Sequence, residues 1–321
     1  MFNAVDIASD PGIVTSHGQG TLYLLTGQYG HYEDITSKPF AARYEARIPT
    51  IFEYLRRNYN VPEHQCLIVN GEDRIDEEFY TFSNHHLYGI HYRSTVLSLF
   101  RFKSYLLREE LKRDRDKPFL SDKEREQKQK RLDAMEQKDY RMRDRHVESP
   151  ELDRFWSRWR DYYGTSGLVN PRGDRVLTTL ALRAIKELRP RLMMINYQDP
   201  DYVHWGNPHF YTRAIAIIDE GIREIYHTVQ ADEEYRDNTV FVIVPDCGRD
   251  NNRCIDIPFQ HHFNSKSSHE IFAVVAGPKK WVPRGGTITK KQQQISAAST
   301  VGELMGFLTP HCDEASLLKV V

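Results

Sequence analysis

The sequence predicts an α/β protein of three layers, in which helices cover both faces of a mostly parallel sheet. In the second half, short apolar runs alternate with longer amphipathic stretches. The runs at 238–246 and 270–278 are apolar without alternation, as expected for strands covered on both faces. Strands that alternate with helices favour parallel pairing.

The remaining elements follow from local patterns. In the first half, 15–20 is typical of a turn, 21–26 of an apolar helix ended by Gly27, 48–58 of an amphipathic helix and 66–71 of a buried strand. In the second half we expect helices at 174–188, 210–229 and 295–308, and a strand at 191–197.

Residues 101–161 differ in composition from the rest of the chain. They are crowded with charges of both signs, which favours a solvated helical hairpin or an extended helix broken near Pro118. The aromatic residues Phe155, Trp156 and Trp159 would anchor its end to the core. The predicted domains are therefore 1–100, 101–161 as a charged helical insertion, and 162–321. The insertion is also a candidate surface for a protein partner or a second subunit.

Composition excludes several classes of protein. Of the 321 residues, 40% are hydrophobic and 28% are charged, which excludes a disordered, collagen-like or membrane-bundle chain. With 44 basic and 45 acidic residues, no attraction to nucleic acid is expected. No apolar run reaches the roughly 18 residues of a membrane span. Four scattered cysteines do not form a disulfide scaffold. The first residues do not resemble a signal peptide, so the localisation stays unknown.

Polar side chains follow the predicted strands at the points where the strands end. Asp199, Asp201 and His204 follow 191–197, and Asp246 and Cys247 follow 238–246. The histidines His261, His262 and His269 come shortly before or at the start of 270–278. Carboxylate, imidazole and thiolate groups gathered at one sheet edge predict a zinc-type site.

In order along the chain, these segments resemble the alkaline phosphatase superfamily, which includes phosphatases, sulfatases, phosphodiesterases and cofactor-independent phosphoglycerate mutases. The resemblance is carried by five segments: TSH followed by LLTG (15–17 and 24–27), INYQDPDYVHWG with its following helix, NTVFVIVPDCG, SHEIFAVVAGP and ISAASTVGELMG. It spans roughly 13–80 and 174–308, and it implies an alkaline-phosphatase-like fold.

The resemblance implies two metal ions, usually zinc or another divalent metal. Asp201 matches a metal-ligating Asp of the superfamily, with Asp199 as the competing choice. The partner His usually lies four positions on, where this sequence has Trp205, whereas His204 lies at three. Asp246 matches the Asp of an Asp-His-Gly motif in which Cys247 replaces the His. For the late His ligand the choice is His269, with His262 second.

The resemblance also implies a nucleophile in the turn before the first helix. Thr15 and Ser16 are the predicted catalytic residues, although counting nine residues back from Thr26 reaches His17. The superfamily places a strand ending in a metal-ligating Asp several dozen residues earlier. Only 14 residues precede Thr15 here. Either this strand is missing from this chain or the protein lacks it naturally, and we then expect one metal site to lose a carboxylate.

Two functions follow. The first is a metal-dependent hydrolase of small phosphate or sulfate esters with altered ligands. The alternative is a catalytically inactive member of the superfamily that serves as a structural or protein-interaction module.

Overall fold

The computed structural model describes residues 1–8, 13–34, 44–71, 80–136, 149–165, 173–204, 207–250, 259–261, 265–282 and 285–320. The chain divides into two compact units, of which the first comprises 1–61, 79–93 and 199–321, and the second 62–78 and 94–198.

The first unit is built on a mixed four-stranded sheet. Its strands, in spatial order, are β7 (Phe241–Ile243), β8 (Glu270–Ala276), β1 (Phe2–Asp6) and β9 (Gln292–Gln293). β8 runs antiparallel to both β7 and β1, whereas β1 and β9 are parallel. A two-stranded antiparallel ribbon, β2 (Tyr32–Asp34) and β3 (Tyr44–Ala46), belongs to the same unit.

The helices of the first unit begin and end at recognisable signals. They are α1 (His17–Thr26), α2 (Ile51–Tyr59), α7 (Pro208–Ala231), α8 (Lys266–His269) and α9 (Ser296–Met305), with short 3-10 turns η3 (Gly89–Tyr92), η5 (Asp199–Tyr202) and η6 (Leu317–Val320). Thr50 and Glu53 form a capping box at the start of α2. Gly27 ends α1 with φ 74°, a left-handed conformation that favours glycine.

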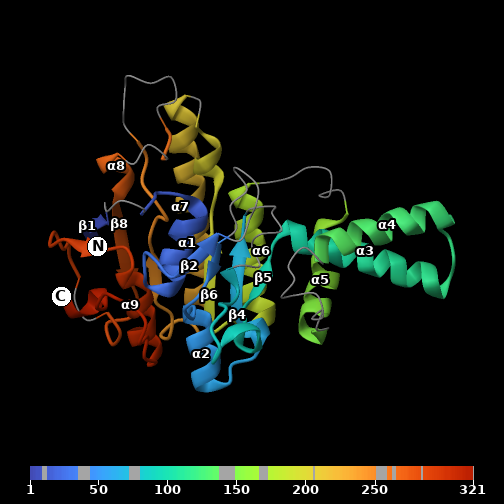
Figure 1. The fold of residues 1–321 in the computed structure, drawn as a ribbon, viewed down its shortest axis with the longest axis horizontal. Coiled ribbons are helices and arrows are strands. Elements are labelled where there is room, and N and C mark those ends of the chain that lie inside the picture. Colours follow the sequence, from blue (N-terminus) through green and yellow to red (C-terminus); the bar gives the residue numbers. More distant parts are fainter. Residues whose placement is uncertain are drawn as a thin grey trace. The chain divides into compact units, whose positions relative to one another are not determined.

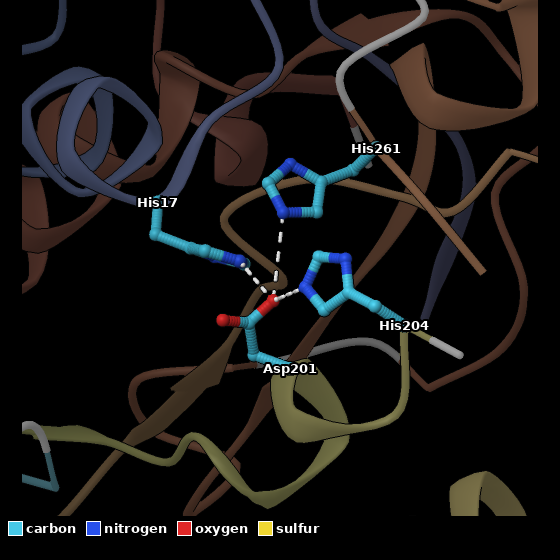
Figure 2. Close-up of side chains that lie close together, drawn as sticks. All are labelled: His17, Asp201, His204 and His261. Carbon is cyan, nitrogen blue, oxygen red and sulfur yellow. Dashed lines mark hydrogen bonds and ion pairs between the residues drawn. The ribbon is translucent and has the colours of Figure 1, made fainter. Parts of the chain in front are cut away.

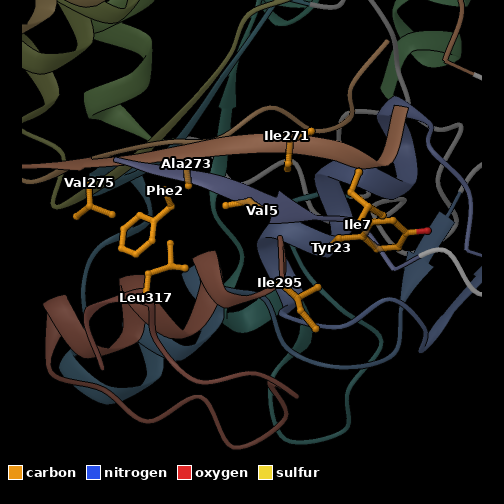
Figure 3. Close-up of a cluster of buried hydrophobic side chains, with 9 residues drawn as sticks. All are labelled: Phe2, Val5, Ile7, Tyr23, Ile271, Ala273, Val275, Ile295 and Leu317. Atoms are coloured by element: carbon orange, nitrogen blue, oxygen red, sulfur yellow. The ribbon is translucent and has the colours of Figure 1, made fainter. Parts of the chain in front are cut away.

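One hydrophobic cluster holds this sheet against the helices (Figure 3). One side of β8 is buried and supplies Ile271, Ala273 and Val275, whereas the alternate residues Glu270 and Phe272 are exposed. The buried side chains from the other elements are Phe2, Val5, Ile7, Tyr23, Ile295 and Leu317. The cluster therefore fixes β1 and α1 relative to each other.

The second unit contains a parallel three-stranded sheet in the order β5 (Thr95–Leu97), β4 (Cys66–Asn70) and β6 (Leu192–Asn196). All five residues of β4 are buried, as befits a central strand. The turn η1 (Glu63–Gln65) leads into β4, and α6 (Asp174–Leu188) precedes β6 and packs on β4.

Three further helices complete the second unit. They are α3 (Leu99–Asp116), α4 (Asp122–Glu136) and α5 (Pro150–Tyr163), so the described part of 101–161 is helical except for the turn at 117–121 and Ser149. The helices α3 and α4 lie side by side (Figure 1) around Leu107, Leu111, Leu132 and Met135. The predicted anchors Phe155, Trp156 and Trp159 of α5 are buried.

The structure confirms a mixed α/β fold with a parallel sheet and differs from the prediction in two elements. The run at 238–246 forms only the short β7, antiparallel to β8, and the described residues between these strands contain no helix longer than α8. The first helix begins at His17, four residues before the predicted start, because Ser16 caps it. None of the described helices combines the length and apolarity that a membrane crossing needs.

The turn between α3 and α4 is organised by the buried carboxylate of Asp114. Its Oδ1 accepts the backbone N–H groups of Phe119 at 2.8 Å and Leu120 at 2.7 Å, and its Oδ2 accepts from Arg125 Nε at 2.6 Å. These hydrogen bonds lower the pKa of Asp114 to about 2.

Replacing Asp114 by Ala should therefore open this turn. We expect the amide protons of Phe119 and Leu120 to exchange at least about tenfold faster at equal pH. Because the pKa is depressed, the stabilisation is present above the ordinary value of 3.8 and is lost as the pH falls through about 2. Asp122→Ala is the matched control, since Asp122 also pairs with Arg125 but its side chain is fully exposed. Equal exchange in both variants would contradict this role of Asp114.

Candidate metal site

The site is built around the start of α1. Ser16 accepts from Gln19 N at 3.5 Å as the N-cap and donates to Gln19 Oε1 at 2.7 Å. Thr15 is buried, donates to the carbonyl of His261 and lies 3.3 Å from Ser268 Oγ. These bonds hold the turn so that His17, the first residue of the helix, carries its ring into the site.

Gly20 allows α1 to approach the backbone of Asp246, which lies three residues after the end of β7. A Cβ added at Gly20 would overlap the backbone carbonyl oxygen of Asp246. The same carbonyl accepts from Gln294 Nε2 at 2.7 Å, so it is held in place. The small residue is thus a steric requirement of the site.

Asp201, in η5, is the centre of the cluster (Figure 2). Its Oδ1 lies 2.6 Å from His17 Nε2 and 2.6 Å from His204 Nε2. The same oxygen is 3.5 Å from His261 Nε2 and 3.3 Å from a guanidinium nitrogen of Arg249. Three imidazole rings from three separate segments therefore point at one carboxylate oxygen.

The other nitrogen of each ring faces an oxygen acceptor. Nδ1 of His261 lies 2.8 Å from the carbonyl oxygen of Thr15, and Nδ1 of His204 lies 3.0 Å from Gln260 Oε1. A carbonyl oxygen can only accept, so both Nδ1 atoms carry the hydrogen. In the neutral ring, the Nε2 lone pair then faces the site, which is the arrangement of metal-ligating histidines.

Asp246 contacts the far side of His17. Its Oδ2 lies 2.6 Å from His17 Nδ1, and its Oδ1 accepts the N–H of Cys247 at 2.8 Å. Two groups of residues thus have ligand atoms within 4.8 Å of one another: His17, Asp201, His204 and His261, and His17, Asp246 and Cys247.

The charges of the site are strongly coupled. Burial by itself would lower the pKa of His17, but Asp246 and Asp201 outweigh it and raise the pKa to about 10. Although burial opposes it, the histidine contacts hold the pKa of Asp201 and of Asp246 below the usual range. Burial and the nearby Asp246 raise the pKa of the Cys247 thiol. Without a metal, an imidazolium therefore bridges two carboxylates.

The donor set fits a divalent metal ion. Asp201 Oδ1 has three imidazole nitrogens and a guanidinium nitrogen within 3.5 Å. This is more hydrogen-bond partners than its two lone pairs can accept. In a tetrahedral zinc site with bonds of about 2.0–2.1 Å, neighbouring ligand atoms are about 3.3 Å apart. The separations of 2.6 Å, 2.6 Å and 3.5 Å bracket that spacing.

The structure brings together most, but not all, of the residues that the sequence pointed to. Asp201, His204, Asp246 and Cys247 all belong to the two groups. Asp199 opens η5 and belongs to neither. Trp205, at the position of the superfamily's partner His, and His262, the second choice for the late His ligand, lie outside the described residues.

For the late His ligand, the structure places His261, and not the predicted His269, among the candidate ligand atoms. His269 is the buried last residue of α8, and its Nδ1 donates to the Ile7 carbonyl at 3.0 Å. In the sequence, the adjacent histidines His261 and His262 are the feature that could have pointed to His261. The Thr15 hydroxyl donates to the His261 carbonyl and the Ser16 hydroxyl to Gln19 Oε1, and neither residue belongs to the two groups of candidate ligands. His17, reached by counting from Thr26, is a member of both groups.

Comparisons with known proteins give little at the level of sequence. No model of a protein family and no curated protein matches the chain. Among solved structures, Ps i-CgsB in complex with k-i-k-neocarrahexaose matches with 12% identity and a TM-score of 0.49, over 98% of this chain and 66% of that protein.

Two further solved structures match at a similar level. BT4656, solved with its substrate D-glucosamine-2-N,6-O-disulfate, shows 12% identity and a TM-score of 0.45 over 99% of this chain and 72% of its own. The phosphonate monoester hydrolase SpPMH from Silicibacter pomeroyi shows 15% identity and a TM-score of 0.48 over 98% and 69%. TM-scores below 0.5 at these identities assign neither a family nor a function.

Gly20→Ala should disturb the site without touching a ligand. The added methyl group overlaps the Asp246 carbonyl, so α1 must shift, and we expect a loss of about 1–3 kcal/mol in the free energy of unfolding. Gly30→Ala is the control, because no atom lies within 4 Å of the added carbon. Equal unfolding midpoints of the two variants in urea would argue against the close approach.

His17 should make the stability of the metal-free protein depend on pH. Because its pKa is raised from 6.5 to about 10, its stabilisation is fully present below 6.5 and is lost as the pH rises through 10. In a chelator, the unfolding free energy should fall across this window by on the order of a few kcal/mol more in the wild type than in His17→Gln. His209→Gln, at an exposed position, should follow the wild type. Parallel pH curves for the wild type and His17→Gln would exclude the bridging imidazolium.

Proposed function

We propose that the chain is a metal-dependent hydrolase of phosphate or sulfate esters, a member of the alkaline phosphatase superfamily with its three-layer architecture and altered ligands. The observation that carries the proposal is the convergence of three imidazole Nε2 atoms on Asp201 Oδ1, with oxygen acceptors behind the rings. The motifs of the sequence support the superfamily and the class of substrate.

Zinc or another divalent metal would be held by His17, Asp201, His204 and His261. When bound, such an ion supplies Lewis-acid stabilisation of the charge that develops on the ester oxygens. Arg249 keeps Asp201 in place, because its guanidinium also donates to the carbonyls of Pro200 at 2.8 Å and Phe259 at 2.7 Å. The positive end of α1, which begins at His17, favours an anionic substrate.

Water is the attacking group in this proposal. Thr15 and Ser16, the sequence candidates for the nucleophile, act instead as positioning residues for His261 and His17, because their hydroxyls donate to the His261 carbonyl and to Gln19. The oxygen of water bonds to phosphorus or sulfur, the ester bond to the leaving oxygen breaks, and a proton ends on that oxygen.

A second candidate is a member that has lost catalysis. The observation that favours it is the His17 imidazolium, which by itself supplies a cation between Asp201 and Asp246. Together with Arg249, which pairs with Asp201, this imidazolium balances the two carboxylates without a metal. Such a protein would act as a structural or protein-interaction module. The helical segment 101–161 is then the proposed surface for a partner.

The first candidate function is tested by assays of ester hydrolysis with the zinc- or manganese-loaded protein. The substrates are aryl phosphate monoesters and diesters, aryl sulfates and phosphonate esters. We expect turnover of at least one ester class, inhibition by a chelator and recovery on adding metal. His204→Ala should lower kcat/KM by at least about 100-fold, because it removes a ligand. The control His209→Ala, at an exposed position, should retain activity. Metal-loaded protein that hydrolyses none of these esters would favour the second candidate.

A further inference from the structure

We infer that the described site takes a single divalent ion in a set of three imidazoles and one carboxylate, and that Asp246 is a positioning residue for His17 rather than a ligand. The inference shares with the proposed function only the requirement that a metal binds. It differs from the superfamily resemblance, which implies two ions and makes Asp246 a ligand.

The three rings follow one pattern. In each of His17, His204 and His261, Nε2 faces Asp201 Oδ1. In each of them Nδ1 faces an oxygen outside the donor set: Asp246 Oδ2, Gln260 Oε1 and the Thr15 carbonyl, at 2.6 Å, 3.0 Å and 2.8 Å. Asp246 therefore stands to His17 as a backbone carbonyl stands to His261. A carboxylate in that position fixes the ring and increases its basicity.

The geometry of Asp246 agrees with this role. One of its oxygens holds His17 Nδ1, and the other accepts the Cys247 N–H at 2.8 Å, so both are engaged inside the protein. A second ion among His17, Asp246 and Cys247 would have to replace the hydrogen bond at His17 Nδ1. The ring would then have to bridge two ions as an imidazolate. An ion in the four-residue group would instead replace the proton between His17 Nε2 and Asp201 Oδ1 and leave the hydrogen bond at His17 Nδ1 in place.

Metal stoichiometry and cobalt spectroscopy of the purified wild-type chain test the inference without any activity assay. Elemental analysis after dialysis against zinc should give one ion per chain. The cobalt form should show the strong visible absorption of tetrahedral coordination, without a band for thiolate-to-cobalt charge transfer. Two ions per chain, no ion, or a thiolate band would each overturn the inference.

Variants separate the ligand from the positioning residue. Asp201→Ala should abolish stoichiometric zinc binding. Asp246→Ala should keep one ion but weaken zinc binding by about 10–100-fold, as expected for a partner behind a ligand, and Asp246→Asn should recover part of the affinity. Cys247→Ala should bind zinc like the wild type. A fall from two ions to one in Asp246→Ala would make Asp246 a ligand and overturn the inference.

The outcomes distinguish this inference from the proposed function. One ion per chain without ester hydrolysis leaves the inference standing and removes the hydrolase. Ester hydrolysis by a protein with two ions per chain would support the hydrolase and overturn the inference of a single ion. Circular dichroism of each variant shows whether it is folded. If a variant does not fold, the metal stoichiometry and the cobalt spectrum of the wild type still decide whether the site takes a single ion.

Discussion

The contact of one imidazole ring with two carboxylates is the interaction on which the site depends. His17 is 184 residues from Asp201 and 229 residues from Asp246 along the chain, yet it lies 2.6 Å from an oxygen of each. Bringing two carboxylates and three imidazoles together is costly unless a cation lies among them. A proton on His17 meets this requirement in the metal-free protein, and a metal ion would meet it in the proposed metal-bound form.

In the proposed metal-bound form, these two cations would compete for the same ring. An imidazole can ligate a metal only through a nitrogen without a proton, so an ion at His17 Nε2 would release the proton that its raised pKa retains. The hydrogen bond from Nδ1 to Asp246 lies on the other side of the ring, so it would persist in both states.

The surrounding fold supplies rigidity at close range. Ile7 and Tyr23, from either side of the turn at Thr15, are buried in the hydrophobic cluster of Figure 3, so β1 and α1 are fixed relative to each other. The backbone of Gly248 donates to the Ser268 carbonyl at 2.8 Å, and an added Cβ there would overlap the Ser267 carbonyl. Packed apolar side chains and two glycines therefore set the positions of groups that carry charge.

The alternation of helices and strands and several candidate residues of the site could be predicted from the amino-acid sequence. Asp201, His204, Asp246 and Cys247 were recognisable because polar residues that follow apolar strands gather where those strands end. The contacts of His261 and His17 with Asp201 Oδ1 became visible only in the tertiary structure. The sequence had pointed to His269 in place of His261, and to His17 only as the residue nine positions before Thr26. The reason is physical: spacing along the chain places a residue near an edge, but the direction of a side chain depends on hydrogen bonds such as that from His269 to Ile7, made by partners hundreds of residues away.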